Sequence, residues 1–183
     1  TGSFHLPFRH FTGWAQSSDG VIYIGYNRSK GIACYRQGQD RFEPCLVGAV
    51  GNYDDQVNCL LTDGPFLWIG SNSGLCRIEP SSGKTEFYTR KEGLINNNVN
   101  TIVADRFNHL WVGTASGLSR LDSSGNFISY SDQNDLPEIG INASFSDPDG
   151  VLHFITTHAF FSLQPDQQTT SEISLQPVIE SVF

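Results

Sequence analysis

Short apolar stretches separated by turn residues recur along the whole chain of 183 residues. Between Val99 and Ser131, the strings "VNTIVAD", "HLWVGT", "GLSRLD" and "FISYS" are each of strand length and rich in β-branched and aromatic residues. The breaks "SSDG", "SNSG", "SSGN" and "DPDG" consist of residues that favour tight turns. No stretch keeps a period of 3.6 residues, so the pattern predicts antiparallel strands and no helices.

The pattern itself repeats at a fixed interval. Trp68 and Trp111 are 43 residues apart, and an apolar residue followed by Asn recurs at steps of 42, at Val57-Asn58, Val99-Asn100 and Ile141-Asn142. Four strands in about 42 residues is the length of a β-propeller blade. We therefore expect an all-β chain with about four blades of four-stranded antiparallel sheet, at residues 9–56, 57–98, 99–140 and 141–173.

One aromatic position recurs in each copy and indicates how the blades pack. Trp68 and Trp111 are expected to fill the space between neighbouring blades, and Gly70 and Gly113, two residues later, to let neighbouring backbones approach closely. In the fourth copy the same position is His153, which we expect to be a packed imidazole rather than a metal ligand.

The charge balance excludes some classes of partner. The net charge is −8, and no run of basic residues occurs, so binding to nucleic acid or to an anionic membrane surface is not expected. No apolar run reaches the 18 residues of a membrane-spanning helix. Because the sequence shows neither an initiator Met nor a signal-peptide pattern, we expect it to be a piece of a longer protein.

Four cysteines, Cys34, Cys45, Cys59 and Cys76, raise the question of metals and disulfides. They form no CxxC pair and lack a histidine at zinc-finger spacing, so no zinc site is predicted. We interpret them as small buried side chains, with a Cys34–Cys45 disulfide across one hairpin as the alternative in an exported protein.

Three further motifs resemble catalytic or metal-binding signatures only in part. "SSGKT" at 81–85 lacks the upstream Gly of a phosphate-binding loop, and "DPDG" at 147–150 lacks the next calcium ligand, so both are predicted to be hairpin turns. His153 and His158 do not have the spacing of a zinc-protease pair. We expect no enzyme activity, no cofactor and no metal.

The third copy resembles a known family. The stretch "VNTIVADRFNHLWVGTASGLSRLDSSGNFISYSDQNDL" is similar to the two-component-regulator propeller repeat of bacterial periplasmic sensors. The positions that carry the resemblance are Val99, Ile102, Asp105, Leu110, Trp111, Gly113, Thr114, Gly117, Leu118, Arg120, Phe127 and Tyr130. The second copy follows the same pattern with Ser71 in place of Thr, and the weaker outer copies extend the resemblance over about residues 9 to 183.

This resemblance implies a sensory domain in the periplasm, part of an inner-membrane receptor with a cytoplasmic output such as a histidine kinase. Many members are associated with the detection of polysaccharide breakdown products. Four copies are fewer than the family's propellers contain, so the chain is expected to be an incomplete, C-terminal propeller fragment. Residues 174–183 are similar to the start of the small β-sandwich that follows such propellers, and are expected to begin a linker to it.

The ligand of such a propeller is expected at the rim where the first strands start and where the second and third strands are joined. The side chains expected there are Arg28, Lys30, Asn58, Asn72, Asn96, Asn100 and Asn142. Amides both donate and accept hydrogen bonds, which suits a hydroxyl-rich ligand, and the two cations suit an anionic sugar or partner. The alternative is that Asn58, Asn100 and Asn142 cap the strand starts through local hydrogen bonds.

Two functions remain open on this basis. The first is a ligand-sensing domain without catalysis, which binds a small molecule or oligosaccharide and contacts the neighbouring blades and β-sandwich of its receptor. The second is an interaction or dimerisation scaffold in the same ectodomain. Uncovered sheet edges favour association, so a homodimer is a candidate assembly, and a tight dimer would favour the scaffold.

Overall fold

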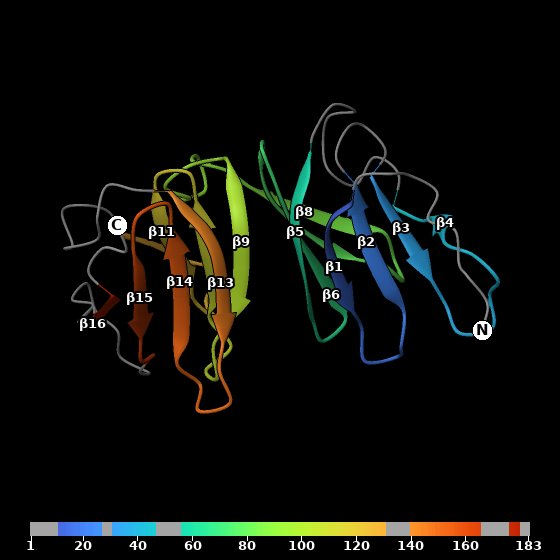
Figure 1. Ribbon diagram of the computed structural model, residues 1–183. Helices are drawn as coiled ribbons and strands as arrows, with labels where there is room; N and C mark the ends of the chain where they lie inside the picture. The colour runs from blue at the N-terminus through green and yellow to red at the C-terminus, as the bar shows by residue number, and fades with distance from the viewer. Residues whose placement is uncertain (1–10, 27–30, 47–55, 131–139, 166–175, 180–183) are drawn as a thin grey trace. The chain divides into compact units, whose positions relative to one another are not determined.

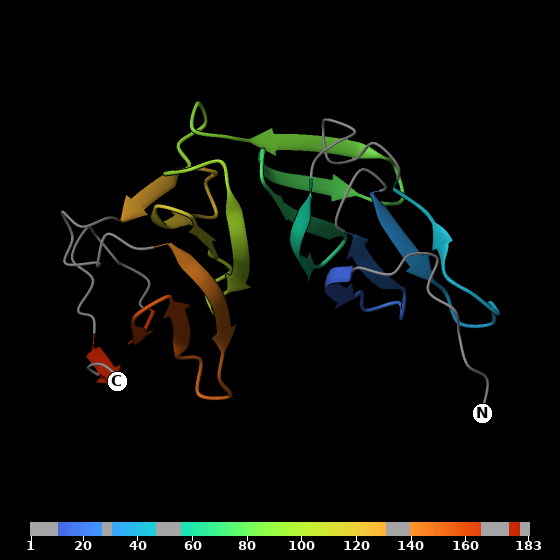
Figure 2. The ribbon, with the colours of Figure 1, turned by 45° about the horizontal axis from the view of Figure 1, so that its top comes forward.

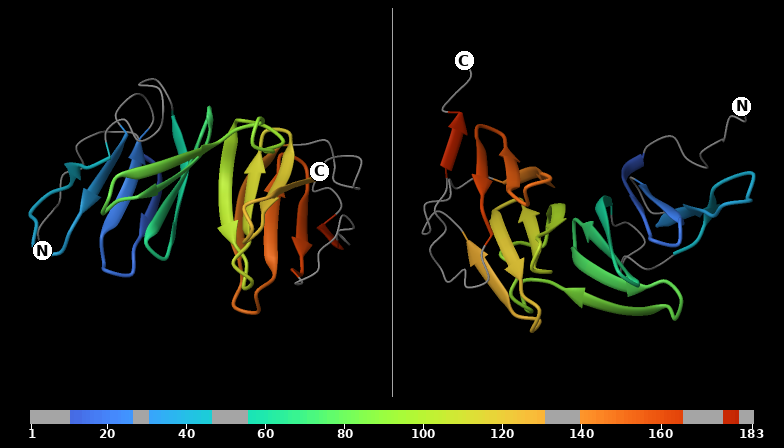
Figure 3. Two further views of the ribbon diagram at one scale, coloured as in Figure 1. Left: turned by 180° about the vertical axis from the view of Figure 1, so that it is seen from behind. Right: turned by 90° about the horizontal axis from the view of Figure 1, so that it is seen from below.

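Four antiparallel sheets of four strands each make up the computed structural model, which describes residues 11–26, 31–46, 56–130, 140–165 and 176–179 (Figure 1). No helix occurs in these ranges, and so none that could cross a membrane. In each sheet the strands follow one another in chain order, as in a propeller blade (Figures 2 and 3). The predicted all-β fold of propeller blades is confirmed.

We number the sheets as blades 1 to 4. Blade 1 consists of β1 (Phe11–Gln16), β2 (Ile22–Tyr26), β3 (Ile32–Tyr35) and β4 (Glu43–Pro44). Blade 2 consists of β5 (Val57–Asp63), β6 (Phe66–Ser71), β7 (Gly74–Glu79) and β8 (Lys84–Tyr88). Blade 3 consists of β9 (Val99–Ala104), β10 (Leu110–Thr114), β11 (Gly117–Leu121) and β12 (Phe127–Tyr130). Blade 4 consists of β13 (Ile141–Ser146), β14 (Leu152–Thr156), β15 (Phe160–Leu163) and β16 (Gln176–Ile179).

The chain divides into two compact units, Thr1–Phe87 and Tyr88–Phe183. The first contains blade 1 and all of blade 2 except Tyr88, the last residue of β8, and the second contains blades 3 and 4. Within each unit the first strands of the two blades lie side by side, β1 with β5 and β9 with β13. Each unit is therefore a pair of stacked blades.

Both units have an apolar core between their blades. In the first unit, Tyr23 and Ile32 of blade 1 cluster with Leu67 and Ile69 of blade 2. In the second unit, Trp111 is fully buried and stacks on Tyr130 at 5.7 Å between ring centroids. Its other neighbour is Phe154 of blade 4, at 6.3 Å. The tryptophan thus fills the space between blades, as the repeat predicted.

Hydrogen bonds also join the blades of each unit. The Thr12 hydroxyl donates to the carbonyl of Val57, and Asn100 Nδ2 donates to the carbonyl of Ile141 at 3.0 Å. Each bond runs from the second position of one first strand to the first residue of the next. The blades are therefore held in register by their innermost strands as well as by their apolar faces.

Glycine at the second position after the aromatic residue brings neighbouring blades close together. A Cβ atom on Gly113 would lie 2.6 Å from Thr101 Cγ2 and 2.7 Å from Ile141 Cγ2. On Gly25, the corresponding residue of blade 1, it would lie 2.4 Å from Val57 Cγ1. The close approach predicted at Gly113 is confirmed.

The last strand differs from the sequence expectation. Residues 174–183 were expected to begin a linker, whereas Gln176–Ile179 form β16, which pairs antiparallel with β15 as the fourth strand of blade 4. Without it, the backbone N–H and C=O groups along the outer edge of β15 would have no ladder partner. The fourth repeat thus takes its outer strand from beyond residue 173.

Candidate functional site

The predicted rim residues belong to two separate units. Asn58 and Asn72 lie in the first unit, and Asn96, Asn100 and Asn142 lie in the second. Arg28 and Lys30 lie outside the described residues.

In blades 2 and 4, the start of the first strand meets the turn between the second and third strands. Asn58 Nδ2 donates to Asn72 Oδ1 at 2.9 Å, across the β6–β7 turn. Asn142 Nδ2 donates to Thr157 Oγ1 at 3.2 Å, across the β14–β15 turn. The first pair joins two predicted rim residues, whereas Thr157 was not predicted, and each pair fixes the direction of an amide.

Asn100 has a different partner because the corresponding turn residue in blade 3 is Ala115, which has no polar side chain. The Asn100 amide instead donates to the carbonyl of Ile141 in the neighbouring blade, at 3.0 Å. This contact supports the alternative interpretation, in which Asn100 hydrogen-bonds to the backbone and does not contact a ligand.

Asn96 lies before β9 and bonds on both sides of its amide. Its Nδ2 donates to Ser116 Oγ at 2.8 Å, and its Oδ1 accepts from the backbone N of Asn98 at 2.8 Å. Ser116 belongs to the β10–β11 turn, at the end of blade 3 where β9 starts. The amides of the second unit thus lie at one end of its strands, next to hydroxyl groups.

The opposite end of blade 3 contains a buried polar cluster that the sequence analysis did not identify as a network. The side chain of Asp105 is fully buried, and its Oδ2 accepts from Trp111 Nε1 at 2.8 Å and lies 3.0 Å from His109 Nδ1. Its Oδ1 accepts from the backbone N of Phe107 and of His109, at 2.8 and 2.9 Å. The repeat pattern includes both Asp105 and Trp111, and their spacing of six positions is the signal that could have linked the two.

Blade 4 keeps this arrangement with an imidazole in place of the indole. His153 Nε2 lies 3.0 Å from Asp147 Oδ2, and its Nδ1 lies 2.8 Å from Ser162 Oγ. The ring stacks between Phe145 and Phe160, at 4.6 and 5.6 Å. The hydrogen bond with His153 is the main cause of the lowered pKa of Asp147. The predicted packed imidazole is confirmed.

The "DPDG" segment forms the expected hairpin turn. Asp147 Oδ1 accepts from the backbone N of Asp149 and of Val151, at 3.0 and 2.9 Å. The carboxylate therefore organises the β13–β14 turn itself. In the described ranges, no three His, Cys, Asp or Glu side chains are grouped so that they could hold a metal ion.

All four cysteines are free thiols, in agreement with the first of the two interpretations. Cys34 and Cys45 hydrogen-bond to each other, and burial raises the pKa of Cys45. Burial also raises the pKa of Cys59 and of Cys76 to about 12.

We expect Cys59 and Cys76 to resist alkylation in the folded chain. At pH 8, a thiol with an ordinary pKa of about 8.5 is ionised to roughly a quarter, whereas one with a pKa near 12 is ionised to about one part in ten thousand. Peptide mass spectrometry after iodoacetamide treatment should show both sites modified at least about a hundredfold more slowly in buffer than in urea. Equal rates in the two solvents would contradict the burial of these thiols.

Residues 93–116 match the two component regulator propeller family. The matched segment contains Asn96, Asn100 and the β9–β10 pair with its buried Asp105. The two-component-regulator repeat thus includes both the amide end and the polar cluster of blade 3.

Solved structures share the fold at low sequence identity. Two are extracellular domains of proteins described as hybrid two component systems of B. thetaiotaomicron. One has 20% identity over 97% of this chain, with a TM-score of 0.67, and the other 19% over 98%, with 0.70. The chain spans only 29% and 27% of their lengths.

An enzyme has the same fold as these two-component-regulator ectodomains. The virginiamycin B lyase of Staphylococcus aureus has 17% identity over 92% of this chain and 55% of the lyase, with a TM-score of 0.69. No curated protein sequence matches the chain significantly. Since sensors and a lyase share these blades, the fold alone does not decide between sensing and catalysis.

Proposed function

We propose that the chain is a ligand-sensing part of the periplasmic ectodomain of a bacterial signal-transduction receptor. The observation that carries this proposal is the two-component-regulator repeat at residues 93–116. Its partners in the receptor are neighbouring blades and a following β-sandwich.

The proposed ligand is a carbohydrate or a related hydroxyl-rich small molecule. Asn96 and Asn142 present side-chain amides beside the hydroxyls of Ser116 and Thr157. One internal hydrogen bond occupies only part of what an amide can donate and accept. Arg28 and Lys30 would extend recognition to an anionic sugar, and Asn58 and Asn72 form the equivalent amide pair of the first unit.

We propose no catalysis by this chain. The amide end of the second unit offers amides and hydroxyls, together with His158 in the β14–β15 turn. General acid–base chemistry needs a titratable side chain within hydrogen-bond reach of the proton that it moves. Amides do not titrate, and of the residues named at this end only His158 can take up or release a proton near neutral pH. Because a lyase has the same fold, chemical conversion of a bound sugar by this chain would contradict this part of the proposal.

The proposal is tested by isothermal titration calorimetry of the chain with defined neutral and uronic-acid oligosaccharides. We expect Asn142→Ala, and separately Asn96→Ala, to weaken binding of the recognised sugar about tenfold, the value of one hydrogen bond. Asn126→Ala is the matched control, since this exposed residue lies in the β11–β12 turn at the other end of blade 3.

Three results would overturn the sensing proposal in different ways. An absence of binding by every oligosaccharide, or equal losses in Asn126→Ala and Asn142→Ala, would favour the scaffold function instead. Release of a product from a bound sugar would favour an enzyme. Asn100→Ala is left out of the series because this amide bonds the backbone of the next blade.

A further inference from the structure

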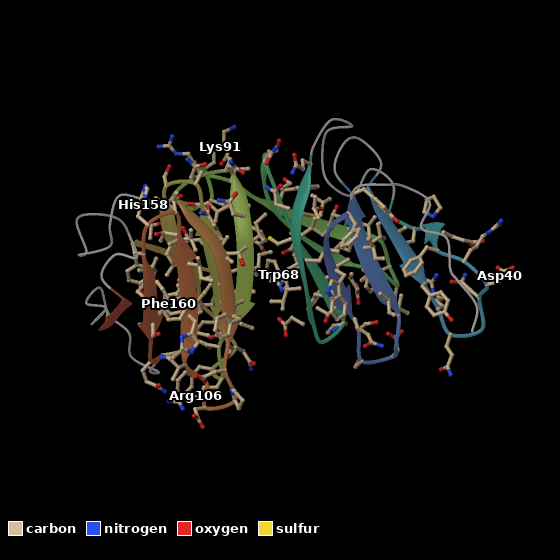
Figure 4. All side chains as sticks on the ribbon, in the orientation of Figure 1. Asp40, Trp68, Lys91, Arg106, His158 and Phe160 are labelled. Carbon is tan, nitrogen blue, oxygen red and sulfur yellow. The ribbon has the colours of Figure 1, made fainter. Side chains whose placement is uncertain are left out.

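Two of the four cysteines lie together at the outer edge of blade 1. Strand pairing places Cys34 of β3 opposite Glu43 of β4, and the backbone N–H of Cys45 donates to the carbonyl of Ile32 at 2.9 Å. Asp40, labelled in Figure 4, lies in the loop that joins the two strands. Side chains alternate between the two sides of a strand, so Ile32, Cys34 and Cys45 lie on the same side of the sheet. The two thiols are therefore diagonal neighbours across the hairpin.

The surroundings of the two sulfur atoms hold them in contact. Cys34 is buried in the apolar core of the first unit, and Cys45 packs, partly buried, against the same core. The two thiols hydrogen-bond to each other, and the Cys45 thiol also donates to the carbonyl of Ile32 at 3.5 Å. The guanidinium of Arg36 lies beside the pair, where its Nη1 donates to Cys34 Sγ at 3.4 Å. Neither sulfur therefore has to cross the core to reach the other.

The backbone at Cys45 has room to adjust. The Cα atoms of diagonal neighbours on paired strands are about 7–8 Å apart, and those of a disulfide are about 4.4–6.8 Å apart. β4 consists only of Glu43 and Pro44, so Cys45 lies beyond the end of the strand. A shift of roughly 1 Å at Cys45 would bring the pair within disulfide range.

We propose that Cys34 and Cys45 form a reversible disulfide that fastens the outer edge of blade 1 under oxidising conditions. The oxidant is a small-molecule disulfide, which exchanges with the two thiols. The structure shows the reduced form, in which both cysteines are free. This proposal stands independently of the sensing function.

The reaction is thiol–disulfide exchange in two steps. The thiolate of Cys45, the less buried of the two cysteines, attacks one sulfur of the oxidant and releases one thiolate. The thiolate of Cys34 then attacks Cys45 Sγ in the mixed disulfide and releases the second thiolate, while Arg36 lies next to the attacking sulfur. The protons of the two protein thiols pass to the released thiolates, and two electrons pass from the protein sulfurs to the oxidant.

The exchange is expected to be slow. Burial, and then the hydrogen bond to Cys34, raise the pKa of Cys45, so little of its reactive thiolate form is present. The proximity of the two sulfurs, rather than a high reactivity, selects this pair. The proposal is therefore a statement about the equilibrium between thiols and disulfide.

The position of the pair favours a reversible bond with a local effect. The shift needed at Cys45 leaves some strain in the disulfide, and strained disulfides are more easily reduced than unstrained ones. The backbone ladder between β3 and β4 is short, and Pro44 has no N–H group to contribute to it. A covalent link next to this short ladder holds β4 on β3, and its reduction lets the edge open.

Equilibration of the complete chain with excess oxidised glutathione tests the link. The remaining thiols are then alkylated in urea, and the linked peptides are identified by mass spectrometry. We expect a Cys34–Cys45 link in most chains, with Cys59 and Cys76 recovered as alkylated thiols. An excess of reduced glutathione should return Cys34 and Cys45 to thiols.

Three variants assign the two steps. In the Cys34→Ser chain, glutathione should accumulate on Cys45, because the second step has no attacking sulfur. The Cys45→Ser chain should form no internal disulfide. Cys76→Ser is the matched control, since Cys76 lies in the same apolar core but on blade 2, and it should leave the Cys34–Cys45 link unchanged. Circular dichroism checks that the variants fold, and Cys34→Ala replaces Cys34→Ser if that chain does not.

Amide hydrogen exchange measures the effect of the link on the blade edge. The backbone N–H groups of Cys45 and Leu46 both donate to the carbonyl of Ile32, and they should exchange about tenfold more slowly in the oxidised chain. The strands of blade 4, which belong to the other unit, should exchange equally fast in both forms.

Any of three results would overturn the proposal. Free thiols at Cys34 and Cys45 after equilibration would show that the pair does not reach disulfide geometry. A link from either cysteine to Cys76, or between two chains, would show that another pairing is preferred. Equal exchange at Cys45 and Leu46 in the two forms would show that the disulfide does not fasten the edge of the blade.

Discussion

Replacing Asp105 by Ala is expected to lower the free energy of unfolding of the second unit by about 4 kcal/mol. The carboxylate is fully buried and accepts hydrogen bonds from Trp111 Nε1 and from the backbone N–H groups of Phe107 and His109. Each donor left unsatisfied in a buried site costs about 1–3 kcal/mol, and part of that cost is recovered when water enters.

Urea denaturation followed by tryptophan fluorescence measures this loss, because Trp111 reports directly on the affected site. Asp122→Ala is the matched control. Asp122 accepts from the backbone N of Ser124 and of Asn126 in an exposed turn, and those bonds, that of Asn126 first, hold its pKa below the ordinary value. Water can replace the lost carboxylate there, so we expect a loss of about 1 kcal/mol.

Asp105→Asn separates hydrogen bonding from charge and shape. The amide keeps one acceptor oxygen but turns an N–H group toward another donor, either Trp111 Nε1 or the backbone N–H groups. The free energy of unfolding of the Asp105→Asn chain should therefore fall nearly as much as that of the Asp105→Ala chain. A loss in Asp105→Ala no larger than in Asp122→Ala would show that the buried network is not a main source of stability in this unit.

The strands and the repeat could be predicted because both depend on local patterns. Alternating turn residues and β-branched stretches determine the strands of blade 3, and the spacing of Trp68 and Trp111 indicates the blade length. The outer strand of blade 4 could not be located in this way. Gln176–Ile179 pairs with β15 through backbone hydrogen bonds. Such pairing does not require a particular side-chain pattern, so a strand this short and atypical cannot be recognised from its sequence.

The candidate site was predictable only in part, since hydrogen-bond partners depend on tertiary contacts. The sequence placed Asn58 near Asn72, and the structure joins them. It treated Asn100 as equivalent to Asn58, yet a single difference in the opposing turn, Ala115, sends the Asn100 amide to the next blade. Equivalent positions in a repeat therefore share a backbone environment without sharing a chemical role.

The fold and the candidate site answer different questions about this chain. Stacked blades position turn residues at one end of the strands, and sensors and a lyase both use that scaffold. Here the amide end of the second unit contributes Asn96, Ser116, Asn142 and Thr157, and the β14–β15 turn adds His158. The amides and hydroxyls support the proposed recognition of a hydroxyl-rich ligand.

Replacing Gly113 by Ala is expected to destabilise the second unit by about 3 kcal/mol, against the usual trend. A Gly→Ala change normally stabilises the folded state by about 0.4–1 kcal/mol where the backbone tolerates it, because alanine lowers the conformational entropy of the unfolded chain. At Gly113 the new methyl group would lie 2.8 Å from Ile141 Cβ and 2.6 Å from Thr101 Cγ2. Ile141 Cβ is fixed to the backbone of β13, so the two blades themselves must separate.

A double-mutant cycle with Thr101→Ser tests this cause. Thr101→Ser removes the Cγ2 methyl group but keeps the hydroxyl that bonds Ser144, so alone it should cost less than about 1 kcal/mol. Combined with Gly113→Ala, it should recover part of the loss, because one of the contacts disappears. Urea denaturation of the four chains gives the coupling energy. Strictly additive losses, or a Gly113→Ala chain as stable as the parent, would mean that the blades can separate without cost and that glycine is not required at this position.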